Sequence, residues 1–227
     1  INYSSIIPQE IIDEFPLGIL NAHGGDLPRY RGNACQAWAI INGEEKIGLC
    51  IHKMVGDELD SGNIIEREYL PIDLNTKIEK VLNWMGNRIP DLFSSAITKL
   101  EDDKNYFLEK QSLNLEDCLR CYPRKPEDAR IKWESSAIDI LRLINASNKP
   151  YSGAFCYFNE EKITIWDAEI LINKENFNAV PGQVIKLNSD SVVISCGDGC
   201  LLIKKTQIKE IVGNPRDSIK SIRDRLE

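Results

Sequence analysis

The feature that most constrains this chain is a change in hydrophobic pattern midway along it. Over roughly the first hundred residues, short apolar segments alternate with segments whose apolar residues recur at helical spacing. Beyond Lys149 the apolar residues fall in short runs separated by Asn, Gly, Pro and Asp. The first pattern indicates an α/β layer structure, and the second indicates a small barrel or open sheet. The sequence therefore predicts an α/β domain followed by a small, mainly β domain.

The first part of the chain supplies alternating strands and helices. A buried strand of a parallel sheet is expected over residues 17–22, and a second strand over 46–54. Thr76-Lys77-Ile78-Glu79 forms a capping box, so a long helix is expected from Thr76 to Leu100, kinked at Pro90. Shorter helices are expected over residues 8–15 and 33–42.

The second part is polar at first and then rich in β signals. Residues 105–133, with Pro123 and Pro126, are interpreted as a connecting segment, and a short amphipathic helix follows around residues 138–144. The division that results is an α/β domain over residues 1–117, a linker over 118–134 and a β-rich domain over 135–227. The expected strands are 155–158, 162–171, 182–187, 191–196 and 201–208, with a last helix over 214–226.

Composition narrows the class of protein and its partners. With 42% hydrophobic and 28% charged residues, the chain is typical of a soluble globular protein, and no apolar run approaches the roughly 18 residues that span a bilayer. The net charge of −7 argues against a large polyanionic partner such as nucleic acid. The chain begins at Ile1, inside an apparent strand, so we expect that an amino-terminal portion precedes it.

Seven cysteines, an odd number without a secretory signal, indicate free thiols in the cytoplasm. A zinc site formed by Cys118, Cys121, Cys196 and Cys200 is the alternative. The second pair straddles an apparent turn at residues 197–199, so we favour free thiols and expect no metal.

Polar residues follow the first buried strand, in the segment from Leu20 to Gly32. Ligands of open α/β sheets bind beyond the carboxyl ends of strands. Asn21 and His23 lie two positions apart, so their side chains point to the same side of an extended segment. They therefore address one small volume, unless Asn21 merely caps the next turn and His23 is a satisfied loop histidine.

A second polar segment follows the neighbouring strand, from His52 to Gly62. Three acids within four positions are ordinarily a solvated loop. Asp60 lies between Leu59 and Gly62 and is the acid best placed to turn inward. His52 lies within the strand and is interpreted as structural.

Taken together, these segments resemble the formyltransferases that use 10-formyltetrahydrofolate, which include methionyl-tRNA, glycinamide ribonucleotide and sugar-nucleotide enzymes. The family's first strands have no counterpart here, and Gly24-Gly25-Asp26 stands where many members have a serine and two leucines. The matching segments are Asn21-x-His23, Leu27-Pro28, Arg31-Gly32, Trp38-Ala39-Ile40, Leu59-Asp60-Ser61-Gly62, Arg130-Ile131-Lys132-Trp133 and Pro150-Tyr151-Ser152-Gly153-Ala154-Phe155.

The resemblance implies a Rossmann-like formyltransferase domain with 10-formyltetrahydrofolate as co-substrate. Asn21, His23 and Asp60 would then be catalytic. The acceptor-side candidates are Tyr30, Arg31 and Asn33, although Tyr30 and Arg31 are equally suited to bracing the loop. The residues that the resemblance places near the pterin are Ser5, Ile6, Ile7, Val55, Gly56, Asp57 and Glu58.

The acidic balance and the short second domain favour one branch of this family, the sugar N-formyltransferases. The implied acceptor is the amine of a nucleotide-linked amino sugar, in lipopolysaccharide or O-antigen biosynthesis. The implied enzyme is a cytoplasmic homodimer that binds neither nucleic acid nor membrane. The alternatives are a methionyl-tRNA formyltransferase and a non-catalytic protein that binds folate or nucleotide on the same fold.

Overall fold

The protein divides into two compact units. The structure, a computed structural model, describes residues 7–112, 114–172 and 177–227. The first unit comprises the chain up to Ala39, Glu44–Asp73 and Lys80–Arg124, and the second comprises Ile40–Gly43, Leu74–Glu79 and Lys125–Glu227. The expected linker over residues 118–134 is thus shared between the units. The first unit is α/β and the second is mainly β, so the predicted fold class is confirmed.

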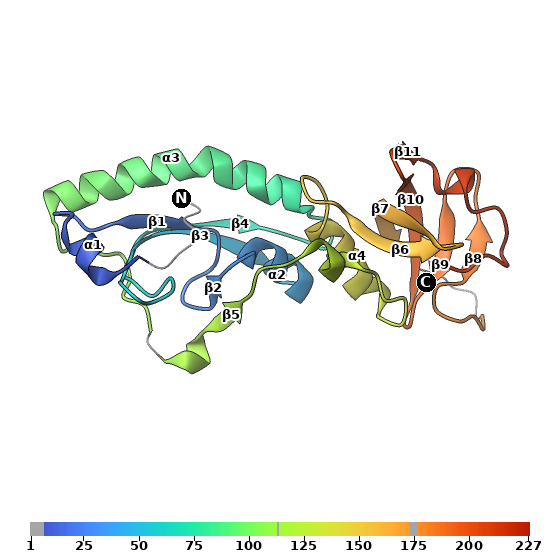
Figure 1. Ribbon diagram of the computed structural model, residues 1–227, viewed down its shortest axis with the longest axis horizontal. Helices are drawn as coiled ribbons and strands as arrows, with labels where there is room; N and C mark the ends of the chain where they lie inside the picture. Colours follow the sequence, from blue (N-terminus) through green and yellow to red (C-terminus); the bar gives the residue numbers. More distant parts are fainter. Residues whose placement is uncertain (1–6, 113, 173–176) are drawn as a thin grey trace. The chain divides into compact units, whose positions relative to one another are not determined.

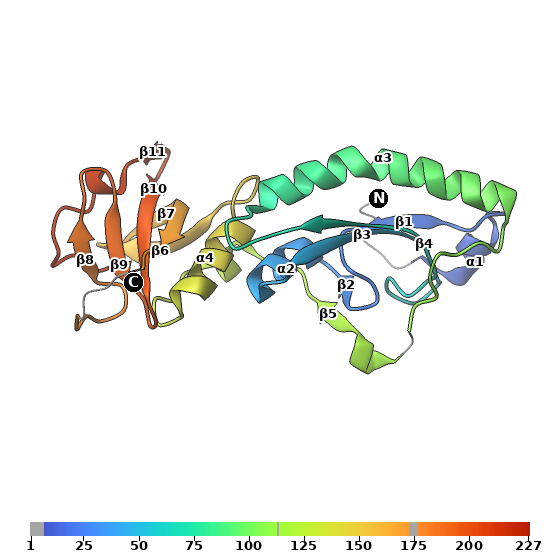
Figure 2. The same cartoon turned by 180° about the vertical axis from the view of Figure 1, so that it is seen from behind.

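A three-stranded sheet forms the centre of the first unit, with strand order β1-β3-β4. Its members are β1 (Leu20–His23), β3 (Lys46–Lys53) and β4 (Ile64–Pro71). The long helix α3 (Ile78–Asp102) covers one side of this sheet, and β2 (Tyr30–Gly32) and β5 (Leu119–Cys121) lie on the other side (Figures 1 and 2). β2 and β5 pair with each other in parallel.

Both pairings within the described three-stranded sheet are antiparallel, so the parallel pairing expected for the first strand is not found there. That strand also begins later than predicted, because Gly18 has a φ of 77°, which interrupts an extended segment. β4 was not predicted, because charged residues occupy both of its faces. Glu66 and Glu68 are accommodated by α3: Lys99 lies 2.7 Å from Glu66, and the Arg88 guanidinium binds both carboxylate oxygens of Glu68.

The predicted helices of the first half are present. α1 spans Gln9–Asp13, α2 spans Cys35–Asn42 and α3 spans Ile78–Asp102. Gly43 follows α2, and its φ of 71° suits the residue after a helix. α3 is continuous past Pro90, so the proline does not divide it. None of the helices in the described ranges is both long and apolar enough to cross a membrane.

A six-stranded antiparallel sheet and one helix form the second unit. Helix α4 (Ala137–Ala146) supplies Ile140, Leu141 and Ile144 to a core that it shares with the sheet. The strands are β6 (Ala154–Phe158), β7 (Glu161–Ile170), β10 (Cys200–Ile208), β9 (Val192–Ser195) and β8 (Val184–Leu187) in spatial order, with β11 (Ile211–Gly213) paired to β10. Single 3-10 turns occur at Leu115–Asp117, Pro126–Ala129 and Pro215–Asp217.

The helix predicted over residues 214–226 is wrong, since only the turn Pro215–Asp217 forms there. The chain after this turn pairs with the segment before β8 instead. The Leu226 amide donates to the Gly182 carbonyl, and Ile219 and Leu226 are buried in the core. Burial of these two side chains together with backbone pairing therefore outweighs local helix propensity.

Candidate active site

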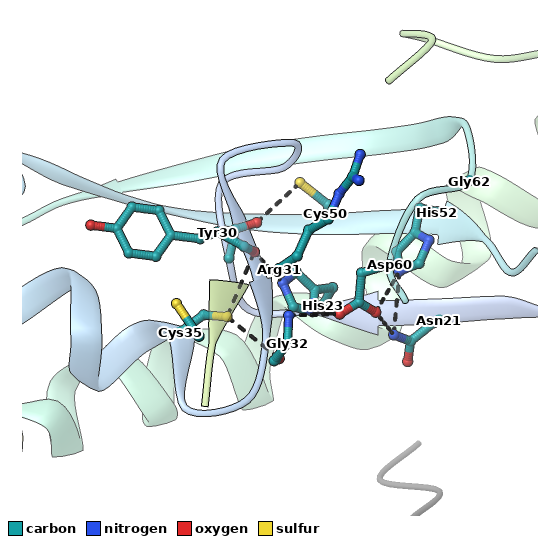
Figure 3. Close-up of polar contacts among 12 residues, drawn as sticks. Asn21, His23, Tyr30, Arg31, Gly32, Cys35, Cys50, His52, Asp60 and Gly62 are labelled. Carbon is teal, nitrogen blue, oxygen red and sulfur yellow. Dashed lines mark hydrogen bonds and ion pairs between the residues drawn. The ribbon is translucent and has the colours of Figure 1, made fainter. Parts of the chain in front are cut away.

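The register of β1 and β3 places four polar or sulfur-bearing side chains on one face of the sheet. Asn21 is paired with His52, and His23 with Cys50. Directly opposed residues of an antiparallel pair project to the same face, and so do residues two apart in one strand. Asn21, His23 and His52 therefore converge on one volume, as Figure 3 shows.

The loop between β3 and β4 brings Asp60 into that volume. Asp60 adopts the left-handed conformation, with φ 48°, and its side chain is only 11% exposed. The amide of Gly32 in β2 donates to Asp60 Oδ2 over 2.9 Å. Asp60 therefore points inward, toward the polar face of the sheet.

Three side chains surround the Asp60 carboxylate. His23 Nδ1 lies 3.4 Å from Oδ2, and His52 Nε2 lies 3.5 Å from Oδ1. Asn21 Nδ2 lies 3.4 Å from Oδ1 and 3.3 Å from His52 Nε2. The structure thus brings Asn21, His23 and Asp60 together and adds His52 as a fourth member of the cluster.

Both ring nitrogens of His23 face acceptors. Nε2 lies 2.7 Å from the Tyr30 carbonyl oxygen, a contact that requires a proton on Nε2. A neutral ring then presents the lone pair of Nδ1 to Asp60, so the geometry favours a second proton between them. Burial opposes this and lowers the pKa of His23, whereas the Asp60 charge and the Tyr30 carbonyl raise it. The cluster can therefore hold a proton at Nδ1 and also release it readily.

Asp60 is the fixed anion of the cluster. Burial by itself would raise the pKa of its carboxyl group. The hydrogen bond from His52, the neighbouring His23 and the Gly32 amide outweigh burial and lower the pKa to about 2. Asp60 is therefore ionised at neutral pH.

Gly25 allows His23 to reach the Tyr30 carbonyl. A Cβ atom at position 25 would lie 2.5 Å from His23 Nε2 and 2.5 Å from the Tyr30 oxygen. Both distances are well inside van der Waals contact, so a side chain there would displace the imidazole or the β2 backbone. This gives a physical reason for glycine within the segment that departs from the family pattern.

The acceptor-side candidates are placed differently from one another. Tyr30 is buried, and its hydroxyl donates to Glu44 over 2.6 Å, so only its carbonyl reaches the cluster. Arg31 donates through Nη2 to Gln111 and to the Ser112 carbonyl. Asn33 is exposed next to β2. The structure thus brings none of these three side chains into the cluster.

The segments expected to hold the pterin are described only in part. Ser5 and Ile6 lie outside the described residues, whereas Ile7 is half-buried. Residues 55–58 form an accessible loop, in which the Gly56 amide donates to Gln9 over 2.8 Å and Asp57 has a φ of 61°. Glu58 accepts from the Ser61 hydroxyl, and Val55 is 36% exposed. Contact of this loop with folate stays a prediction.

Sequence reasoning missed two residues next to Asp60. His52 was interpreted as structural, although its pairing with Asn21 across the sheet places it on the carboxylate. Alternation along β3 puts His52 on the same face as Cys50, but only the register relates that face to Asn21. Gln111, in the polar connecting segment over residues 105–133, contacts the Asp60 backbone, and nothing in that segment signals this.

The described residues do not gather further metal ligands around this cluster. Within the described residues, no group of three or more His, Cys, Asp or Glu side chains is placed to hold a metal ion. Cys118, Cys121, Cys196 and Cys200 are free thiols there, and burial raises the pKa of Cys121, Cys196 and Cys200.

Comparison with known proteins identifies the family. The family model "Formyl transferase" matches residues 1–97, and "Formyl transferase, C-terminal domain" matches residues 124–214. A methionyl-tRNA formyltransferase of Acetivibrio thermocellus is 31% identical over 206 residues, which are 90% of this chain and 64% of that protein. The chain thus spans less than two thirds of the length of this relative.

Solved structures show the same fold. An N-formyltransferase from Helicobacter canadensis, in complex with folinic acid and dTDP-3-aminofucose, matches with TM-score 0.68 and 19% identity, over 92% of this chain and 72% of that one. HypX from Aquifex aeolicus, in complex with tetrahydrofolic acid, matches with TM-score 0.66 and 21% identity, over 97% of this chain and 37% of that one. With both family models matched in order, the chain belongs to the formyl transferase family.

Proposed function

We propose that this protein transfers the formyl group of 10-formyltetrahydrofolate to the amine of a nucleotide-linked amino sugar. The observation that carries the proposal is the cluster in which Asn21, His23 and His52 surround the ionised Asp60. Membership of the formyl transferase family supports the transferred group. A structural neighbour crystallised with a folate and dTDP-3-aminofucose supports the acceptor class at the level of fold.

The reaction needs an oxyanion donor and a path for one proton. The acceptor amine attacks the formyl carbon, and the formyl oxygen becomes an oxyanion in the tetrahedral intermediate. The bond from that carbon to the folate N10 then breaks, while the amine loses a proton and N10 gains one. The enzyme must therefore stabilise a transient negative charge and carry a proton between two nitrogens.

Asn21 suits the first requirement. It is half-buried, whereas His23 and His52 are buried, so its amide is the group of the cluster most open to a substrate. Its Nδ2 already donates within the cluster, to Asp60. An amide N–H directed at the formyl oxygen contributes about 10²–10³ in rate in comparable oxyanion sites.

His23 and Asp60 suit the second requirement. Nδ1 of His23 faces Asp60 Oδ2 and can take up a proton there, and burial lowers the pKa of the ring, so a proton taken up is readily released. The ionised Asp60 stabilises the imidazolium whenever the ring takes a proton from the amine. His52 contacts the other carboxylate oxygen and holds the anion from the opposite side.

Charge supports a small acceptor. Residues 125–227 contain 15 lysines and arginines against 15 aspartates and glutamates, and residues 1–124 contain 13 against 20. Neither part has the basic excess typical of proteins that bind a large nucleic acid. The absence of nucleic acid among the partners therefore remains part of the proposal, as do a homodimer, a cytoplasmic location and a role in lipopolysaccharide biosynthesis.

A methionyl-tRNA formyltransferase is the second candidate, because a protein of that name is 31% identical to this chain. A single assay separates the candidates. The protein is incubated with 10-formyltetrahydrofolate and, in parallel, with a panel of nucleotide-linked amino sugars or with methionyl-tRNA, and formylated products are identified by mass spectrometry.

We expect a formylated sugar nucleotide and no formylmethionyl-tRNA. Transfer to methionyl-tRNA alone would overturn the acceptor. Folate binding without transfer to any acceptor would support the non-catalytic alternative.

A further inference from the structure

A second group of contacts holds the backbone of the Asp60 loop. Gln111 follows α3 in the chain and is 3% exposed. Its Nε2 donates to the Asp60 carbonyl over 2.9 Å and to the Gly62 carbonyl over 2.6 Å. One side chain thus binds the backbone on both sides of Ser61.

The Asp60 backbone needs such support. A residue other than glycine at φ 48° is in the left-handed region, which costs about 1–3 kcal/mol and persists only where the surroundings enforce it. The Gly32 amide fixes the carboxylate, at Oδ2, but does not fix the carbonyl. Gln111 supplies the missing constraint, because its two hydrogen bonds determine the direction of the Asp60 and Gly62 carbonyls.

Arg31 determines the orientation of the Gln111 amide. Its Nη2 donates to Gln111 Oε1 over 2.9 Å and to the Ser112 carbonyl over 3.0 Å. A guanidinium only donates, so Oε1 must face Arg31 and Nε2 must face the loop. Arg31 precedes Gly32 in β2, and a closed ring of contacts therefore runs from β2 through Gln111 to Asp60 and back to β2.

We propose that Gln111 is a positioning residue, which acts through Asp60 and keeps its carboxylate on His23 and His52. The proposal rests on the proposed formyl transfer for its kinetic consequences. Gln111 does not touch the reacting atoms in this arrangement, since its polar atoms are all engaged by Arg31 and by the loop. The alternative is a buried glutamine that stabilises the fold and has no separate effect on the cluster.

The first test is Gln111→Met, which keeps the length of the side chain and removes its hydrogen bonds. Gln207→Met is the matched control, because Gln207 also accepts from a side-chain N–H, that of Trp166, and donates to a carbonyl, that of Lys209. We expect kcat to fall about tenfold in Gln111→Met, with both KM values within about twofold, since misplacement of a reacting group lowers kcat. The control should keep its kcat, and a Gln111→Met enzyme with unchanged kcat would overturn the proposal.

A double-mutant cycle with Asp60→Asn separates positioning from stability. If Gln111 acts through Asp60, Gln111→Met should lower kcat much less in the Asp60→Asn background than in the wild type. Equal losses in both backgrounds would show that Gln111 acts independently of Asp60, and would refute the proposal.

A third measurement does not depend on transfer. The chain has two histidines, both in the cluster, so NMR titration of the two imidazoles reports on it directly. Asp60 and the Tyr30 carbonyl raise the pKa of His23, whereas the charges of His52 and Arg31 lower it. Release of Asp60 in Gln111→Met should therefore lower the His23 pKa, whereas Gln207→Met should leave it unchanged.

These results also distinguish the failure of either proposal. A lower His23 pKa in Gln111→Met, with no formyl transfer by the wild type, would retain the positioning role and reject the proposed function. Normal transfer by the wild type with an unchanged His23 titration in Gln111→Met would retain the proposed function and reject the positioning role.

Discussion

The two units of this protein use buried polar groups in opposite ways. In the first unit, Asn21, His23 and His52 all face one ionised carboxylate, and each has another polar group as its neighbour. In the second unit, the side chains of α4 and the sheet form an extensive apolar core, and buried amides such as Asn148 bind single backbone carbonyls. In the candidate site, buried polar side chains contact one another. In the apolar core of the second unit, a buried polar side chain instead binds the backbone.

This contrast predicts that stability and activity can be damaged separately, and the largest change in free energy is expected in the scaffold. Ile165 of β7 is fully buried in the core of the second unit. Ile165→Ala should lower the free energy of unfolding by about 2–5 kcal/mol, measured in urea, because it leaves a cavity. The kcat of the folded enzyme should stay within about twofold of the wild type, and a large fall in kcat would contradict the separation.

The next largest effect is expected at the cluster, where substitutions should lower kcat rather than stability. Asn21→Ala and His23→Ala should each lower kcat by about 10² or more, which corresponds to about 2.7 kcal/mol of transition-state stabilisation. Folate binding, measured by calorimetry, should persist in His23→Ala. A His23→Ala enzyme with normal kcat would show that the ring takes no part in the reaction.

A somewhat smaller change, in the free energy of unfolding, is expected when pH is lowered. The folded-state pKa of Asp60 is about 2, below its usual value of 3.8, so Asp60 contributes stability above pH 3.8 that is lost as pH falls toward 2. The contribution is about 2 kcal/mol. The lowered pKa of His23 acts in the same direction, since acid below pH 6.5 must charge a buried ring.

The pH prediction is checked by measuring the free energy of unfolding of wild type and Asp60→Asn between pH 2 and pH 7. The variant should show the weaker dependence below pH 4, because it lacks the titrating carboxyl group. Parallel curves for the two proteins would show that Asp60 is not held by the cluster as described. At pH 7, kcat of Asp60→Asn should fall about as far as that of His23→Ala.

The smallest effect is expected at Tyr30. Its hydroxyl donates to Glu44 and its ring is buried, so Tyr30→Phe should lower the free energy of unfolding by about 0.5–1.5 kcal/mol. The KM for the acceptor should not change if Tyr30 braces the loop. A severalfold rise in that KM would restore Tyr30 as an acceptor contact.

Much of the fold could be predicted because its signals are local. The apolar spacing of α3 and α4, the glycine after α2 and the turn residues between the later strands each act within a few positions of the chain. The convergence of Asn21 and His23 was also predictable, because alternation along one strand is enough to place both on one face.

The remaining features depend on contacts between distant segments. The position of His52 relative to Asn21 follows from the register of two strands, and that of Gln111 from a segment 51 residues beyond Asp60. β4 was not predicted because its acidic residues, which α3 neutralises, do not indicate a strand. The segment after Asp217 is not helical because its Leu226 amide binds the Gly182 carbonyl. None of these partners can be read from local composition.

The close approach at Gly25 has a consequence for engineering of the segment between β1 and β2. Alanine at this position already places a carbon 2.5 Å from both His23 Nε2 and the Tyr30 oxygen, so we expect variants at position 25 to displace the imidazole or the β2 backbone. Arg29 and Asn33 are exposed, on either side of the short strand β2. Substitutions at these two positions can alter the surface of this segment and leave intact the backbone that binds His23.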